Sequence, residues 1–145
     1  MNKDKKGIMQ FVKFALVGVA NTAVDWVFFF IFNRWFNIAR IIAKALSFIV
    51  SVINSYLLNS NWTFKKEYKD VLLKGERKKV EAGLFTRFLI VSLVGLLINS
   101  VAYNLTYNNL GTISADRWRD IAALFVASAS GIIWNFFANK LWTYK

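Results

Sequence analysis

Four long apolar runs constrain the fold of this chain more than any other feature of its sequence. They cover residues 14–33, 45–64, 88–107 and 121–139, and charged residues stand between them. Each run has close to 20 residues, and an α-helix of that length spans roughly 30 Å, the thickness of the hydrocarbon core of a bilayer. The pattern predicts an all-α integral membrane protein with four transmembrane helices, forming a single domain over residues 1–145.

Two segments of the chain allow more than one interpretation, the first apolar run and the central connection. The first run follows a basic tail, as in a cleaved signal peptide, but it is too long for the apolar part of such a peptide. We therefore expect it to remain as a membrane span. The highly charged connection of residues 65–87 fits either a solvated loop or short helices on both sides of Gly75 that lie on the membrane surface.

The distribution of basic residues predicts the orientation of the chain. The net charge is +11; the two tails and the central connection together hold 14 Lys and Arg residues, and the other two connections hold 5. The positive-inside rule then places both termini in the cytoplasm. Because the basic residues lie beside the spans, they suit anionic lipids, and no basic domain remains for binding nucleic acid.

The residues that are missing limit the chemistry. The chain has no His and no Cys, which removes imidazole bases, thiol nucleophiles and the common soft metal sites. The spans also lack a pair of acids of the kind that catalyses hydrolysis. We therefore expect no enzymatic activity, no bound metal and no cofactor.

The two halves of the sequence resemble each other. Phe11–Phe14 matches Phe85–Phe88 at an offset of 74 residues, and Asn59–Lys65 matches Asn139–Lys145 at an offset of 80. The six additional residues are expected in the second outer connection. Each half is then a helical hairpin that starts and ends inside, which makes the repeat a parallel one.

Polar residues inside the apolar runs are the first candidates for a site. Asp25 is the one acid deep within any run, and an acid in hydrocarbon costs about 2.5 kcal/mol or more. Asn21 lies one helical turn earlier, so we expect its amide to hydrogen-bond the Asp25 carboxyl. Asn99 is the repeat equivalent of Asp25, and Asn54 and Asn135 lie on polar faces of the second and fourth spans. Helix packing is the alternative role, most of all for the Ser and Gly residues on the same faces.

Basic residues at the inner ends of the spans are the second set of candidates. Lys13 and Arg87 occupy equivalent positions of the repeat, and Lys140 lies at the same level. Arg offers two parallel hydrogen bonds to phosphate oxygens, and Lys offers a compact charge. These residues are candidates for binding a phosphate, and setting the orientation of the chain is their alternative role.

Taken in order, these segments resemble the GtrA family of small four-span bacterial membrane proteins, which includes the GtcA-like teichoic acid glycosylation proteins. Lys13–Asp25 is similar to the opening basic-Phe-x-x-x-Gly-x-x-Asn-Thr segment of the family, and Arg87–Val91 to the start of its third span. Asn135–Tyr144 resembles the closing segment, and Asn54–Phe64 resembles its second-span counterpart.

One segment departs from the family pattern. The end of the second span usually has a basic residue before its Trp, whereas this chain has Ser60 and Asn61 before Trp62. A phosphate contact at this end of the second span is therefore in doubt, while Lys140 keeps it in the fourth.

The resemblance implies a function in the bacterial cytoplasmic membrane. The family is associated with moving polyprenyl-phosphate-linked monosaccharides to the outer leaflet, where membrane glycosyltransferases use them to glycosylate envelope polymers such as teichoic acid or O-antigen. In this reading Lys13, Arg87 and Lys140 capture the phosphate. The sugar path is lined by Asp25, Asn21, Asn54, Asn99 and Asn135.

Four helices enclose little volume, so we expect a homo-oligomer. Two other functions fit the sequence. One is a small multidrug-type proton-coupled exporter, which likewise has four spans and an acid in the first. The other is an accessory membrane subunit of a glycosyltransferase.

Overall fold

The structure, a computed structural model, describes residues 3–110 and 116–145, with side chains for 5–110 and 118–145. Its elements are α1 (Lys3–Phe30), η1 (Ile31–Trp35), α2 (Arg40–Leu58), η2 (Asn59–Thr63), α3 (Lys65–Leu72), α4 (Arg77–Asn109), α5 (Asp116–Ala138) and η3 (Asn139–Thr143), where η marks a π-helical turn. In these residues there are helices and no strand. Four helical stretches are long and apolar enough to cross a membrane: Lys5–Trp35, Arg40–Thr63, Arg77–Asn109 and Trp118–Thr143. The predicted all-α, four-span fold class is confirmed.

The helices extend beyond the apolar runs, most clearly in the central connection. Of the two predicted helices around Gly75, α3 is separate, but the second is the beginning of α4, which starts at Arg77. The alternative of a solvated loop over 65–87 is wrong. Lys, Arg, Glu, Leu and Ala dominate this segment, and all of them have high helix propensity. The polar residues lie outside the apolar runs, but their high helix propensity lets α4 begin at Arg77, before the third apolar run.

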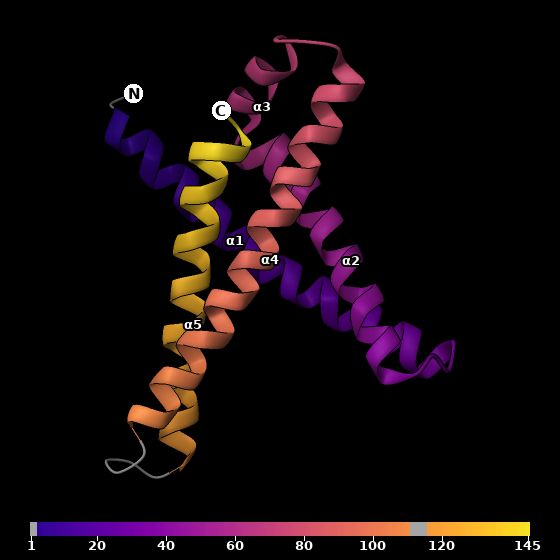
Figure 1. Cartoon of the computed structure of the whole chain (residues 1–145), viewed down its shortest axis with the longest axis vertical. Coiled ribbons are helices and arrows are strands. Elements are labelled where there is room, and N and C mark those ends of the chain that lie inside the picture. Colours follow the sequence, from indigo (N-terminus) through magenta and orange to yellow (C-terminus); the bar gives the residue numbers. More distant parts are fainter. Residues whose placement is uncertain (1–2, 111–115) are drawn as a thin grey trace. The chain divides into compact units, whose positions relative to one another are not determined.

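The chain divides into two compact units, each built on one helical hairpin. The first unit comprises Met1–Phe85 together with Tyr144, and the second comprises Thr86–Thr143 together with Lys145. In the first hairpin, α1 with η1 and α2 with η2 are joined through a short turn in which Asn37 has a φ of 51° (Figure 1). Asn tolerates this left-handed conformation better than most residues. We call the end where a hairpin's chain enters and leaves its open end, and the end where its helices connect its loop end.

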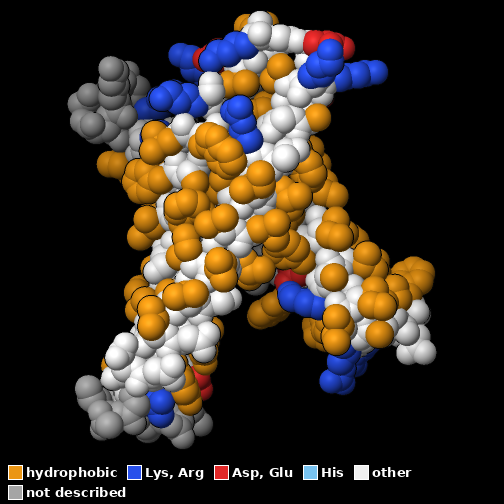
Figure 2. All heavy atoms as spheres, viewed as in Figure 1, with side chains coloured by type: hydrophobic (Ala, Val, Ile, Leu, Met, Phe, Trp, Pro, Cys, Tyr) orange, Lys and Arg blue, Asp and Glu red, His pale blue; other side chains and the backbone are white. Residues whose placement is uncertain are grey.

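At the open end of the first hairpin, α3 is tied to the beginning of α1. Lys6 Nζ lies 3.0 Å from Glu67 Oε1, and Gln10 Nε2 donates to the same oxygen at 2.9 Å. Partial burial acts to raise the pKa of Glu67, but hydrogen bonds from the backbone, Lys6 and Gln10 outweigh it and hold this pKa below its ordinary value. In Figure 2, Lys and Arg side chains gather around α3, and hydrophobic side chains cover much of the other helices.

In the second hairpin, α4 and α5 run side by side (Figure 1). Near the open end, Trp134 Nε1 donates to the carbonyl oxygen of Val91 at 3.1 Å. Near the loop end, the Tyr103 hydroxyl donates to Asp120 Oδ1 at 2.8 Å. The predicted longer outer connection falls on residues 111–115, outside the described residues.

Burial repeats between the hairpins at the two predicted offsets. At an offset of 80, seven buried residues of the first hairpin each have a buried counterpart in the second: Ala43, Ser47, Ser51, Tyr56, Asn59, Thr63 and Phe64 match Ala123, Ala127, Gly131, Phe136, Asn139, Thr143 and Tyr144. At an offset of 74, Gln10, Phe14 and Val17 match Leu84, Phe88 and Val91. The repeat predicted from short motifs is therefore also a repeat of which side chains are buried.

Candidate functional site

A basic side chain lies over a Trp ring at the open end of each hairpin. Lys13 Nζ is 5.4 Å from the ring centroid of Trp62, and Arg87 Cζ is 5.9 Å from that of Trp142. Arg87 Nη1 also donates to the carbonyl oxygen of Trp142 at 3.3 Å. Both distances are within the range of a cation–π attraction. Lys13 and Arg87 were predicted to be equivalent, and in the structure each lies over the equivalent Trp residue of its own hairpin.

The Trp residues belong to the π-helical turns η2 and η3, which also occupy equivalent positions. Asn59 Nδ2 donates to the Ser55 carbonyl at 2.9 Å, and Asn139 Nδ2 donates to the Asn135 carbonyl at 2.8 Å. An Asn amide that bonds the carbonyl four residues earlier competes with regular α-helical bonding. In η2 the turn is wider than an α-helical turn, and the backbone N–H of Phe64 bonds the carbonyl five residues back. Such π turns are frequent at functional sites.

Each π turn also buries polar atoms that have no hydrogen-bond partner. They are Oδ1 of Asn59 and Oγ1 of Thr63 in the first hairpin, and Oδ1 of Asn139 and Oγ1 of Thr143 in the second. All four residues are at most 4% exposed. Unsatisfied buried polar atoms are rare in proteins. Their occurrence at equivalent positions of both hairpins makes the open ends candidates for a functional site. These residues lie in the segments that revealed the sequence repeat, but the repeat did not predict that they are buried.

Ser60 occupies the position that is equivalent to Lys140, and the two side chains have different surroundings. Lys140 Nζ lies 5.3 Å from the ring centroid of Phe136 and is half-buried. Ser60 is buried, and its hydroxyl is 3.0 Å from that of Tyr144, whose ring stacks on Phe64 at 4.7 Å. A basic residue at position 60 would place a charge inside this contact. The small hydroxyl side chain of Ser60 fits this buried contact.

The predicted bond between Asp25 and Asn21 is wrong. Asp25 Oδ2 pairs with Lys44 Nζ, and Ser47 Oγ donates to Asp25 Oδ1 at 2.7 Å. Asn21 Oδ1 instead accepts a bond from Asn54 Nδ2 at 3.3 Å. Lys44 stands just before the second apolar run, among the basic residues of the first outer connection. Because α2 faces α1, cross-helix partners replace the one expected along α1 itself.

The other two predicted path residues lie between α4 and α5, each beside a glycine of the opposite helix. A Cβ atom on Gly95 would be 2.8 Å from Cγ of Asn135, and one on Gly131 would be 3.5 Å from Nδ2 of Asn99. Asn135 Nδ2 donates to the Gly131 carbonyl at 2.9 Å, and its Oδ1 is buried without a partner. Asn99 and Asp25, although equivalent in sequence, therefore have different surroundings.

The loop end of the second hairpin holds a cluster that the sequence did not suggest. Tyr103 and Tyr107 stack with centroids 5.9 Å apart, and Tyr103 bonds Asp120. The Arg119 guanidinium lies 4.2 Å from the Tyr107 ring centroid and donates to the carbonyl of Tyr107 at 3.1 Å. Tyr spacing along α4 was the available signal, but it is also that of an interfacial belt.

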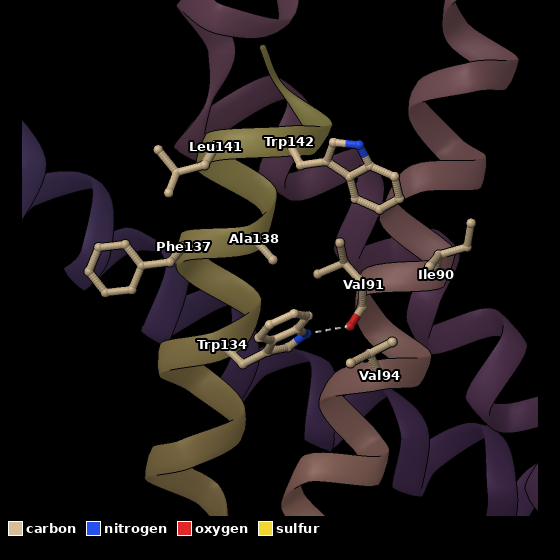
Figure 3. A pocket seen from close by; sticks show the side chains of 8 residues that line it. All are labelled: Ile90, Val91, Val94, Trp134, Phe137, Ala138, Leu141 and Trp142. Carbon is tan, nitrogen blue, oxygen red and sulfur yellow. Dashed lines mark hydrogen bonds between the residues drawn. The ribbon is translucent and has the colours of Figure 1, made fainter.

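An apolar groove opens on the second hairpin (Figure 3). Its volume is about 380 Å³, and its eight lining residues include Ile90, Val91, Val94, Trp134, Ala138 and Trp142. We call it the α4/α5 groove. One of its walls is the Trp142 ring on which Arg87 lies. The groove therefore joins a hydrophobic surface to a cation.

Two comparisons place these features among known proteins. The family model described as GtrA/DPMS, transmembrane domain, matches residues 13–144. The chain is also 26% identical over 140 residues to an uncharacterized membrane protein, YngA, of Bacillus subtilis (strain 168). That alignment covers 97% of this chain and 82% of the other protein. The family match includes every candidate site residue.

Proposed function

The chain belongs to the GtrA/DPMS transmembrane-domain family, and from this we propose that it carries a polyprenyl-phosphate-linked monosaccharide across the bacterial cytoplasmic membrane. Membership relates the chain to polyprenyl-phosphate sugars, and proteins of this family are typically non-catalytic membrane proteins. Its four candidate spans make it a multi-pass membrane protein. In this proposal the chain delivers the sugar to a glycosyltransferase that modifies an envelope polymer such as teichoic acid or O-antigen.

One observation carries this proposal above the others: each hairpin presents a cation on a Trp ring at its open end. Lys13 and Arg87 lie where the polar end of a lipid would enter the hairpins if both termini are cytoplasmic. Trp suits the membrane interface because its ring is apolar and its N–H is polar. A Lys or Arg beside it supplies the charge-assisted bonds that a phosphodiester requires.

Polar side chains between the helices supply the second part of the proposed path. Asn21 with Asn54, and Asp25 with Ser47, offer hydroxyl-binding groups within the first hairpin. A sugar that crosses hydrocarbon needs such groups, because an unpaired hydroxyl in an apolar medium costs several kcal/mol. In the second hairpin, Asn99 and Asn135 have the same proposed role.

The pairing of Asp25 separates this proposal from a multidrug exporter. A proton-coupled exporter of cations uses an acid that its substrate can neutralise, whereas Asp25 is already neutralised by Lys44. An accessory subunit without transport of its own is the remaining alternative. Only an assay with the isolated protein distinguishes that role from transport.

The test is a leaflet-resolved transport assay with the purified full chain in liposomes. The vesicles contain a polyprenyl-phosphate monosaccharide, and an impermeant sugar-oxidising or sugar-binding reagent reports the fraction in the outer leaflet. We expect the wild type to equilibrate the two leaflets. Arg87→Ala should slow this by about tenfold or more, since a charged hydrogen bond contributes about 1.5–3 kcal/mol.

Lys13→Ala should have a similar effect, because Lys13 is the equivalent cation. Lys66→Ala is the matched control: it removes an exposed basic residue of α3 that lies over no Trp ring. Failure of the wild type to move the lipid in this assay would contradict the transport function and support an accessory role. Equal rates for Arg87→Ala and Lys66→Ala would refute the phosphate role of Arg87.

A further inference from the structure

The α4/α5 groove is apolar throughout its interior. The Val91 carbonyl beside the groove accepts a hydrogen bond from Trp134 Nε1 at 3.1 Å, as the dashed line in Figure 3 marks. This bond also uses the polar atom of Trp134, so the indole presents only hydrocarbon to the groove. A polar ligand would find no partner inside, and a hydrocarbon chain would lose none.

A positive charge lies beside one of the residues that line the groove. Trp142 forms its wall on one side and supports the Arg87 guanidinium, 5.9 Å from the ring centroid. Arg87 is exposed. A molecule with an apolar chain and an anionic head would therefore place the chain against the indoles and the head at Arg87. Charge and hydrophobicity select one class of ligand here, an anionic lipid.

The first hairpin has different residues at the positions equivalent to three lining residues of the groove. At an offset of 80, Trp134 corresponds to Asn54, Ala138 to Leu58, and Leu141 to Asn61. Leu58 adds side-chain volume where Ala138 leaves space, and Asn61 replaces a hydrocarbon surface by an amide. Residues of the first hairpin can therefore be introduced into the second as test substitutions, because an equivalent hairpin already contains them.

We propose that the α4/α5 groove holds the isoprenoid chain of the carried lipid, with the lipid phosphate at Arg87. This inference rests on the proposed function for the identity of the lipid. Isoprene units are flat at their double bonds and branched by methyl groups, so they pack against indole faces better than saturated acyl chains do. A second protein copy suits the groove less, because a groove of about 380 Å³ accepts only a few side chains, whereas stable interfaces bury roughly 1,200 Å² or more.

The test is photo-crosslinking of the purified full chain in liposomes. The probe is a polyprenyl phosphate with a diazirine in its isoprenoid chain, and the comparison probe is phosphatidylglycerol with a diazirine in an acyl chain. Labelled residues are mapped by mass spectrometry. We expect the isoprenoid probe to label the groove residues of α4 and α5, and unlabelled phosphatidylglycerol not to compete.

Two substitutions alter the groove, one by filling it and one by making its lining polar. Ala138→Leu introduces the first hairpin's residue and should lower groove labelling about tenfold, as expected for loss of roughly 1.4 kcal/mol of binding. Leu141→Asn changes a side chain that is 61% exposed, so it should fold, and it should lower labelling in the same direction. Ser128→Phe is the control, since it places the equivalent first-hairpin residue at an exposed position of α5 outside the groove.

Unchanged labelling in both groove variants, or equal labelling by the phosphatidylglycerol probe, would overturn the inference and leave an ordinary lipid contact. The transport assay separates this failure from failure of the proposed function. Normal transport with labelling elsewhere would refute the groove alone. Groove-specific isoprenoid labelling without transport would refute the transport function and leave the groove as a lipid site.

Discussion

The two hairpins are alike at their open ends and different farther along their helices. Both open ends have a π turn, a buried Asn that bonds the carbonyl four residues earlier, and a cation on a Trp ring. Beyond these ends the first hairpin joins its helices by bonds between side chains, from Asn54 to Asn21 and from Ser47 and Lys44 to Asp25. In the second hairpin the helices approach closely at Gly95, and a side-chain bond from Tyr103 to Asp120 joins them near the loop end.

Sequence equivalence accounts for this difference. Gly95 occupies the position of Asn21, so the second hairpin has no side chain where the first has an amide. Small residues let membrane helices approach closely and gain dispersion contacts, whereas paired amides hold them by hydrogen bonds. The open ends are therefore a shared feature of the two hairpins, whereas the contacts that join the helices farther along differ between them.

The largest expected effect tests the ion pair between Asp25 and Lys44 in the first hairpin. Lys44→Met leaves Asp25 without its cation and should lower the free energy of unfolding by about 2–3 kcal/mol, below the value for a fully buried pair because Lys44 is exposed. The double variant Asp25→Asn/Lys44→Met should recover most of this loss. The measurement is thermal unfolding in detergent, arranged as a double-mutant cycle. Additive effects would show that the pair does not hold α1 to α2.

A smaller effect tests close approach in the second hairpin. Gly95→Ala places a methyl group against the Asn135 amide and should cost about 1–3 kcal/mol, as other overpacked sites do. Gly131→Ala is the matched control, because its new methyl group would meet Asn99 at an ordinary contact distance. We expect it to change stability by less than about 0.5 kcal/mol. Equal melting temperatures for the two variants would contradict the proposed difference in packing.

The smallest effect concerns the tie between α1 and α3, again a feature of the first hairpin, since the equivalent of Gln10 is Leu84. The pKa of Glu67 is lower in the folded state than in the unfolded state. Its stabilising contribution is therefore present above the unfolded pKa, near 4.5, and is lost as the pH falls through the folded value. Because the pair is partly exposed, we expect less than about 1 kcal/mol.

The measurement compares the wild type with Glu67→Gln in melting experiments between pH 7 and pH 3. The difference between the two proteins should shrink as the pH falls. A constant difference over this range would mean that ionised Glu67 does not stabilise the contact.

Much of the fold could be predicted because a bilayer imposes a simple rule on sequence. Four apolar runs of the right length predicted four spans, and the motifs around Lys13, Arg87, Trp62 and Trp142 predicted the repeat. Helix ends were less predictable. The charged residues before the third apolar run have high helix propensity, so α4 starts at Arg77, well before the run begins.

The candidate site was predicted by residue type better than by contact. Asp25 stood out because an acid in an apolar run is costly, but its partner was assigned along the same helix. Lys44 and Ser47 lie about 20 residues away in sequence, and spacing within one helix says nothing about a facing helix. The groove at Ala138 and the Tyr103–Asp120 cluster depend on two helices at once, so spacing within a single helix does not identify them.

The sequence alone determined that this chain forms four membrane helices in two similar halves, with basic residues at one set of helix ends. It could do so because length, hydropathy and charge are properties of each segment. The tertiary structure decided that Asp25 is paired with Lys44, that Lys13 and Arg87 lie on Trp rings, and that an apolar groove lies beside Arg87. These features depend on which faces of two helices meet, and side-chain packing sets that choice.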